Sequence, residues 1–196
     1  MEKIDRTVIE ALLRQIKRPG INDLIDYLQG GTDFYSAPAS TRFHGAEPGG
    51  LVRHSMEVYR QLNDIMQMYQ DVLDYPIDHD TTLICGLLHD VCKANFYKAG
   101  TRNVKNEQTG QWEKVPCYTI DDEMPLGHGE KSVIILQQFI SLKKEEVLAI
   151  RWHMGGFDDA ARSYAGGMSM GKAADDCKLV TLLQMADMAA SRLMEV

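Results

Sequence analysis

Residues 83–91 read LICGLLHDV, an apolar run that carries a histidine and an aspartate near its end. Such a run predicts a buried helical segment, which would place His89 and Asp90 in the protein interior. A buried charge without a partner is costly, and a bound metal ion would compensate it. We therefore interpret the pair as metal ligands. A second His-Asp pair, at residues 79–80, lies in a polar stretch that predicts a helix start instead.

Other histidines and aspartates also fall on apolar helical faces. His54, for example, shares a face with Val58 and Leu62. Taken singly, each could be an ordinary hydrogen-bonded core residue. Distributed over several helices, they match the way a helical bundle builds a metal site at its centre. The candidate metal ligands are His54, His89, Asp90, His128, His153 and Asp187.

Three short motifs carry a family resemblance: GGLVRHS at residues 49–55, LLHDVCK at 87–93 and MADMA at 185–189. Together with the order His, His-Asp, His, His, Asp, they resemble the HD-domain superfamily of metal-dependent phosphohydrolases. The resemblance covers residues 40–190, and the nearest likeness is the HD domain of bacterial 3′-5′ exoribonucleases. Cys92 stands where that family usually has glycine. We interpret it as a small packing residue, with a thiol ligand as the alternative.

The resemblance implies an all-α, HD-domain helical bundle, and the apolar periodicity is mostly helical. The helical period disappears at residues 96–120, where the pattern predicts a small β-hairpin insertion. Repeated glycines predict a mobile loop at 155–172. We expect a single HD domain over 1–196, with N-terminal helices and a loop at 1–50 and a metal-binding helical core at 51–195. Helices are predicted at 4–17, 21–28, 51–73, 81–95, 127–140, 144–153 and 174–195.

One or two divalent transition-metal ions are expected at this site. Mixed imidazole and carboxylate ligands favour iron, manganese, nickel, cobalt or zinc over calcium. Lys93 matches the lysine of the family's His-Asp-x-x-Lys motif, so Lys93 and Asp90 are the expected catalytic residues, with Lys93 neutralising a bound phosphate. The expected ligands are His54, His89, Asp90 and Asp187 for one ion, and His128 and His153, with Asp90 bridging, for a second.

Basic residues close to the ligand segments are candidates for binding the rest of a substrate, because a phosphate-bearing ligand needs cationic donors. Two of them lie on predicted ligand helices, and two lie in the loop ahead of the first ligand helix. These candidates are Lys131, Arg151, His44 and Arg42.

These features predict a metal-dependent phosphohydrolase that cleaves a phosphomonoester or phosphodiester of a nucleotide-like substrate by a metal-bound hydroxide. A small phosphorylated or nucleotide substrate is favoured over short single-stranded RNA. The reason is that we find no counterpart of the nucleic-acid-binding OB domain that the exoribonucleases carry. Two alternatives stay open at this point: an HD-fold di-iron oxygenase, which is an oxidoreductase, and a non-catalytic ligand-sensing HD module.

The composition is consistent with a compact enzyme. The chain has 196 residues, 44% of them hydrophobic, which is enough for one well-buried core. The net charge of −7 disfavours non-specific binding to long nucleic acid or anionic membrane. We see no leader and no apolar run of the ~20 residues that a bilayer requires, so a cytoplasmic protein is expected. The four cysteines lack paired spacing and are interpreted as reduced thiols. The sequence does not specify an oligomeric state.

Overall fold

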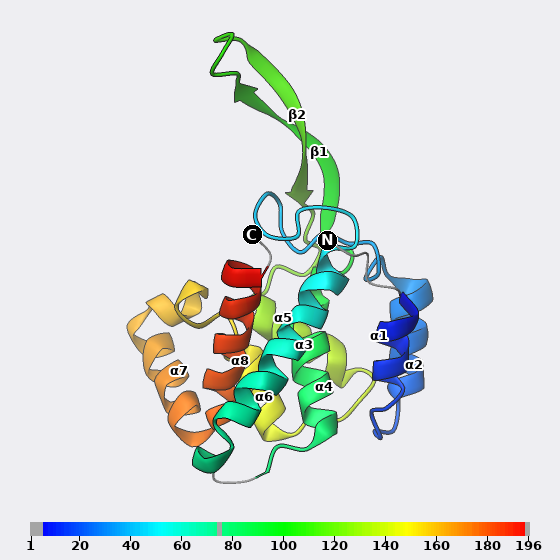
Figure 1. The fold of residues 1–196 in the computed structure, drawn as a ribbon, viewed down its shortest axis with the longest axis vertical. Coiled ribbons are helices and arrows are strands. Elements are labelled where there is room, and N and C mark those ends of the chain that lie inside the picture. The colour runs from blue at the N-terminus through cyan, green and yellow to red at the C-terminus, as the bar shows by residue number, and fades with distance from the viewer. Residues whose placement is uncertain (1–5, 74–75, 195–196) are drawn as a thin grey trace.

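A computed structural model describes residues 6–73 and 76–194, which form a helical bundle with one projecting hairpin (Figure 1). This arrangement confirms the predicted all-α bundle with a β-hairpin insertion. The helices are α1 (Arg6–Leu13), α2 (Ile21–Asp26), α3 (Gly50–Met68), α4 (His79–Leu88), α5 (His128–Gln137), α6 (Lys144–Trp152), α7 (Tyr164–Asp176) and α8 (Lys178–Ala189). The strands are β1 (Tyr97–Lys105) and β2 (Trp112–Ile120).

Helix α3 lies at the centre of the bundle and packs against both α4 and α8. Helix α8 in turn packs against α6 and α7, and α5 packs against α6. Leu51 and Leu62 of α3, Leu87 of α4 and Leu183 of α8 are all fully buried in one hydrophobic core. The helices that carry the candidate ligands therefore share a single core, which holds their ends in fixed relative positions.

Glu146 ties the beginnings of α4 and α6 to the segment that follows α1. Its fully buried carboxylate accepts hydrogen bonds from the Arg18 guanidinium, with Nη2–Oε1 at 2.6 Å, and from the Thr81 hydroxyl at 2.7 Å. It also accepts from the backbone N–H of Lys143 at 2.7 Å, which closes the N-terminus of α6. Since α4 and α6 each end at a candidate ligand, this anchor helps to place both ligands.

Helices α3 and α4 approach closely at Gly86, where an added Cβ would lie 2.6 Å from the Tyr59 Cα. We expect Gly86→Ala to lower the free energy of unfolding by about 1–3 kcal/mol, because the methyl group would force the helices apart. Gly171→Ala is the matched control, since Gly171 lies on α7 with no atom within 4 Å of an added Cβ. There, alanine should stabilise the helix by up to about 1 kcal/mol. Urea unfolding of both variants measures the difference, and equal effects would contradict the close approach.

The prediction of a loop over 155–172 is wrong for its second half, because α7 begins at Tyr164. The Ser163 hydroxyl caps this helix by accepting from the Gly166 N–H at 3.0 Å. A Cβ on Gly166 would lie 1.9 Å from the Ala160 carbonyl oxygen. Glycine here allows the helix to touch the preceding turn, so its presence does not mark a loop.

Two predicted helices are interrupted at a residue with non-helical backbone angles. The helix predicted at 81–95 ends at Leu88, because Asp90 has φ −110° and ψ 23° and a 3₁₀ turn follows. The helix predicted at 174–195 breaks at Cys177, which adopts the extended values φ −143° and ψ 103°.

Other predicted boundaries differ by a few residues. The helix predicted at 4–17 ends at Leu13, where the backbone bond of Gln15 shifts to the carbonyl of Leu12 at 3.0 Å. The helix predicted at 51–73 ends at Met68. The predicted start at residue 4 and the predicted end at residue 195 lie outside the described residues.

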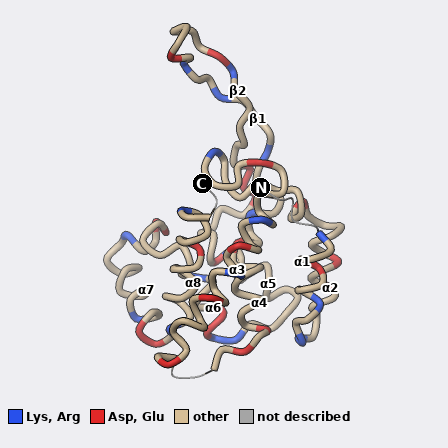
Figure 2. The backbone as a smooth tube through the Cα atoms, in the orientation of Figure 1, with Lys and Arg blue, Asp and Glu red and all other residues tan. Residues whose placement is uncertain are grey.

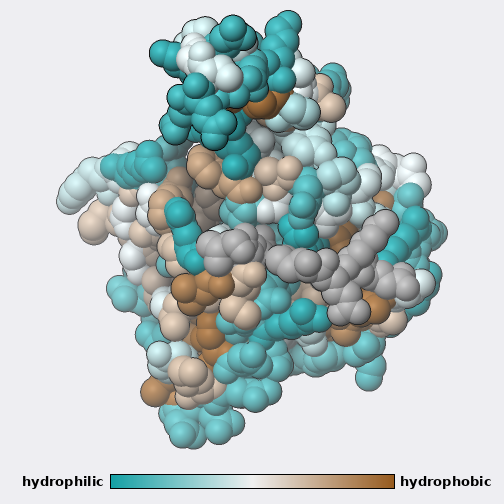
Figure 3. All heavy atoms as spheres, turned by 45° about the horizontal axis from the view of Figure 1, so that its top comes forward, coloured by the Kyte–Doolittle hydropathy of each residue, from teal (hydrophilic) through white to brown (hydrophobic). Residues whose placement is uncertain are grey.

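The hairpin pairs β1 and β2 antiparallel, from Tyr97 opposite Ile120 to Lys105 opposite Trp112. It projects from one end of the bundle, and residues of both charge signs occur on it and on the helices (Figure 2). Figure 3 shows largely hydrophilic side chains over the hairpin, with hydrophobic side chains exposed on the bundle beneath it. Among the described helices, none has the length and apolar character needed to span a bilayer.

Candidate metal centre

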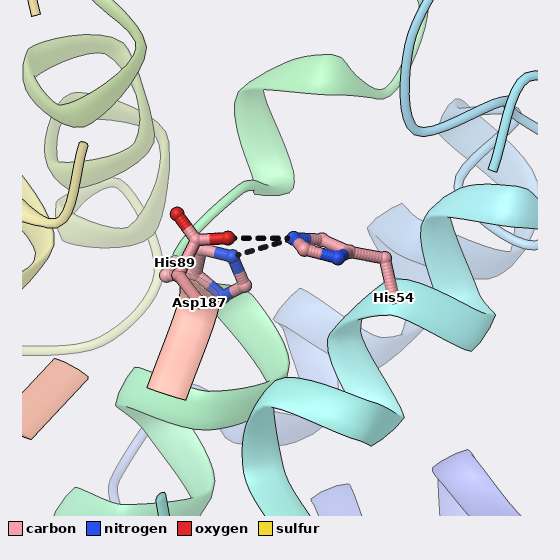
Figure 4. A group of neighbouring side chains, drawn as sticks. All are labelled: His54, His89 and Asp187. Atoms are coloured by element: carbon pink, nitrogen blue, oxygen red, sulfur yellow. Dashed lines mark hydrogen bonds and ion pairs between the residues drawn. The ribbon is translucent and has the colours of Figure 1, made fainter. Parts of the chain in front are cut away.

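The side chains of three candidate ligands, His54, His89 and Asp187, point toward one another (Figure 4). His54 comes from α3, Asp187 from α8, and His89 directly follows α4. The His54 Nε2 atom lies 3.3 Å from Asp187 Oδ1 and 3.4 Å from His89 Nε2. Both imidazoles are fully buried, so these polar atoms converge on a site shielded from bulk water.

Asp90 extends this cluster in two directions. Its Oδ1 lies 3.3 Å from His153 Nε2, and its Oδ2 lies 3.5 Å from His89 Nε2. The same Oδ2 forms an ion pair with Lys93 Nζ at 2.7 Å. The Asp90 carboxylate thus stands between the group around His54 and the group around His153.

The same kind of hydrogen bond, from the ring to a nearby backbone carbonyl, orients His89 and His153. Each is the residue that caps the C-terminus of its helix, α4 or α6. Each donates from Nδ1 to the carbonyl three residues earlier, Gly86 at 3.0 Å and Ile150 at 2.7 Å. These bonds use carbonyls that a helix end leaves unpaired, and they leave Nε2 of each ring facing the neighbouring side chains of the cluster. The negative ends of both helix dipoles also favour a cation there.

His128 opens α5 and completes the set of predicted ligands. Its Nδ1 lies 3.5 Å from the Cys92 Sγ, and its ring is 5.4 Å from the Phe96 ring, centroid to centroid. Donor atoms of Asp90, Cys92 and His128 all lie within 4.8 Å of one another. The structure therefore brings all six predicted ligands together, and Cys92, the alternative thiol ligand, lies beside them.

Burial and charge set the protonation of the cluster. Burial lowers the pKa of His89 to about 3, which keeps the imidazole neutral. Burial disfavours the Asp90 carboxylate, but the Lys93 ammonium, supported by His153, outweighs this effect and holds the Asp90 pKa well below its usual range. Burial also disfavours the charged form of Lys93. The Asp90 carboxylate favours that form more strongly, so the pKa of Lys93 is raised. Burial likewise disfavours the charged form of His153, but Asp90, whose Oδ1 faces Nε2, outweighs this effect and raises the His153 pKa. An ionised Asp90 and a neutral His89 are in the forms that bind metal, whereas a metal at His153 would compete with a proton.

The donor set fits a divalent metal ion. Asp90 Oδ1 and His153 Nε2 are buried and lie 3.3 Å apart, yet neither makes a hydrogen bond within the described residues. Buried polar atoms without partners are rare in folded proteins, and a cation between them would satisfy both. Two overlapping donor groups, His54 with His89 and Asp187, and His89 with Asp90 and His153, each have all ligand atoms within 4.8 Å. The site can therefore hold a metal through nitrogen and oxygen ligands.

A cavity of about 740 Å³ opens beside this centre. Lys93, His153 and Asp187 all reach its wall. Its wall also includes His44, whose ring lies 4.9 Å from the His54 ring, centroid to centroid. The cavity therefore gives a substrate access to the metal centre.

The other predicted substrate-binding residues are differently placed. Lys131 is buried, forms an ion pair with Asp122 and lies 4.6 Å from the Phe96 ring centroid. Arg151 is paired with Glu130 and Asp158. Substrate binding by these residues stays a prediction, and their pairing with carboxylates favours a structural role. Arg42 is exposed in the loop ahead of α3.

Much of the cavity wall was not predicted from the sequence, including Phe157, Gln184 and Arg192. Gln184 could have been predicted, because it lies one helical turn before Asp187 and therefore on the same face of the helix. Nothing in the sequence places Phe157 at the cavity, since it lies in a segment whose pattern predicts only a loop.

Comparisons with known proteins give two further findings. A family model described as HD domain matches residues 51–190. The dihydroneopterin 2′,3′-cyclic phosphate phosphodiesterase of Methanocaldococcus jannaschii is 29% identical over 97 residues, which is 49% of this chain and 36% of that protein. The chain thus spans about a third of the length of this curated relative. No solved structure matches the chain significantly. The likeness to exoribonucleases is not confirmed and stays a prediction.

Proposed function

The chain belongs to the HD-domain family, whose model matches residues 51–190. On this premise we propose that it is a metal-dependent phosphohydrolase acting on a phosphoester of a small, nucleotide-like compound. The observation that carries the proposal is the convergence of His54, His89, Asp90 and Asp187 beside a cavity whose wall includes Lys93. The partial similarity to a cyclic phosphate phosphodiesterase supports hydrolysis of a phosphoester.

The metal ligands we propose follow the donor groups of the cluster, and His128 joins them through Asp90, whose donor atom lies within 4.8 Å of the His128 donor atom. We propose that Cys92, whose Sγ lies 3.5 Å from His128 Nδ1, orients the His128 ring. When bound, divalent ions at such a site lower the pKa of water and offset charge on phosphoryl oxygens. The proposed ligands are His54, His89, Asp90 and Asp187 for one ion, and Asp90, His128 and His153 for a second.

Lys93 is the residue that we propose to contact the phosphoryl group. Its ammonium is held by Asp90 Oδ2 at 2.7 Å, and its side chain is part of the cavity wall. A lysine ammonium carries three donors, so Nζ can donate to a phosphoryl oxygen. A fixed cation in a water-poor site stabilises charge that develops in the transition state.

The proposal predicts hydrolysis that needs metal and does not need dioxygen. A panel of nucleoside monophosphates and nucleoside 2′,3′-cyclic phosphates should contain at least one ester that the metal-loaded protein cleaves under nitrogen. Treatment with EDTA should abolish this cleavage, and restoring the metal should recover it. Chromatography of the products measures both effects. Activity that appears only with dioxygen would favour the oxygenase alternative and overturn the proposal.

A further inference from the structure

The cavity beside the metal centre is larger than a phosphoryl group requires. Its volume of about 740 Å³ is in the range of pockets that bind whole small molecules. Lys93, His153 and Asp187 form only part of its wall. The remaining wall is therefore available to contact another part of the substrate.

Two phenylalanines stand out in this remaining wall. Phe43, from the loop ahead of α3, is 68% exposed, and Phe157, from the turn after α6, is 53% exposed. Met154 and Met188 add further apolar surface. Large apolar side chains that gather around one cavity commonly mark a ligand-binding surface. Aromatic faces are well suited to stack against planar rings.

Polar groups accompany the two rings. The Arg192 guanidinium carbon lies 5.7 Å from the Phe157 ring centroid, which is a cation–π distance. Gln184 is held by a hydrogen bond from its Nε2 to the Trp152 carbonyl at 2.8 Å. Ser191 follows Asp187 by one helical turn and also lines the cavity. The edge of a heterocycle can form hydrogen bonds with such polar groups, whereas an acyl chain cannot.

We propose that Phe43, Phe157 and Arg192 form a ring site that binds an aromatic heterocycle of the substrate. The phosphoester of the same molecule would then lie toward Lys93. The position of the phosphoester rests on the proposed function. The ring site itself can bind a ligand that has no phosphoester. Phe43 and Phe157 are thus specificity-determining residues.

Binding of nucleosides tests the ring site without any hydrolysis. We would titrate the metal-loaded protein with adenosine, guanosine, cytidine and uridine, using saturation-transfer NMR. Ribose is the control, because it lacks the aromatic heterocycle. At least one nucleoside should bind, and ribose should not. Phe43→Ala and Phe157→Ala should each raise the Kd by about tenfold, the scale of one lost stacking contact. Tyr164→Ala is the matched control, because Tyr164 is 87% exposed on α7 and does not line the cavity, and it should leave the Kd unchanged.

Several outcomes would overturn the ring site: no nucleoside binds, ribose binds equally well, or both phenylalanine variants bind like the wild type. Weaker binding in Tyr164→Ala as well would also overturn it, since a general loss of structure would then be responsible.

Hydrolysis separates the ring site from the proposed function. For adenosine 2′,3′-cyclic phosphate, kcat/KM should fall about tenfold in Phe157→Ala. For glycerol 1,2-cyclic phosphate, which lacks an aromatic heterocycle, kcat/KM should stay unchanged. Equal losses on both esters would overturn the ring site and leave the function standing. Nucleoside binding as expected, with no ester hydrolysed by the wild type, would support the ring site and contradict the proposed function.

Discussion

Replacing Asp90 with alanine should remove both metal binding and turnover. One oxygen of this carboxylate lies 3.3 Å from His153 Nε2, and the other lies 3.5 Å from His89 Nε2, so a single change affects both proposed metal positions. The loss of kcat/KM should be at least about 10³-fold, which exceeds the 10- to 100-fold cost of removing an outer partner of a ligand. Elemental analysis and steady-state kinetics measure the two effects.

Asp80→Ala is the matched control for this change, because the chain holds a second His-Asp pair in a different setting. Asp80 lies in the first turn of α4, where its carboxylate accepts from the Lys17 backbone N–H at 2.9 Å. We expect this variant to keep its metal and its activity. Asp90→Ala also leaves the buried Lys93 without its counterion, so Asp90→Asn should be measured beside it, with a thermal melt of each. Full metal content in a folded Asp90→Asn protein would contradict the bridging role.

Lys93→Met should lower kcat by about 10²-fold or more, the scale for losing one preorganised contact to a transition state. The metal content should stay unchanged. The ammonium is 2.7 Å from Asp90 Oδ2 and reaches the cavity wall. Methionine keeps much of the apolar stem and removes only the charge. Bound metal would replace the lost cation beside Asp90, so thermal stability of the metal-loaded protein should change little.

Lys98→Met is a suitable comparison, because Lys98 is an exposed lysine on β1 paired with Asp121. It should leave both metal content and kcat unchanged. Unchanged kcat and KM in a metal-loaded Lys93→Met variant would place Lys93 among the structural residues. Loss of metal in that variant would instead show that Lys93 acts by holding Asp90.

The candidate ligands were predictable because their signal is local. His89 and Asp90 stand out within an apolar run, and His54 and Asp187 lie on apolar helical faces, so the sequence alone indicates burial of each. Their convergence required the family resemblance, since periodicity does not say which helices meet. The structure places all of them at one centre.

Features that depend on backbone detail were not predictable. The α4 helix ends at Leu88, and the Nδ1 bonds of His89 and His153 exist only because each follows a helix end. Glycine in α7 was interpreted as a loop signal, although Gly166 serves close packing. The same limit applies to the cavity, because Phe43 and Phe157 come from irregular segments whose positions no periodic pattern fixes.

The central claim is that this cluster is a metal centre, and the metal-to-protein ratio tests it most directly. The protein would be purified without added metal, reconstituted separately with iron, manganese, nickel, cobalt and zinc, desalted, and analysed by mass spectrometry for metals. We predict about one to two ions per chain for at least one of these metals, as expected for one or both proposed positions. A ratio below one ion per chain for every metal, in protein that a thermal melt shows to be folded, would contradict the account.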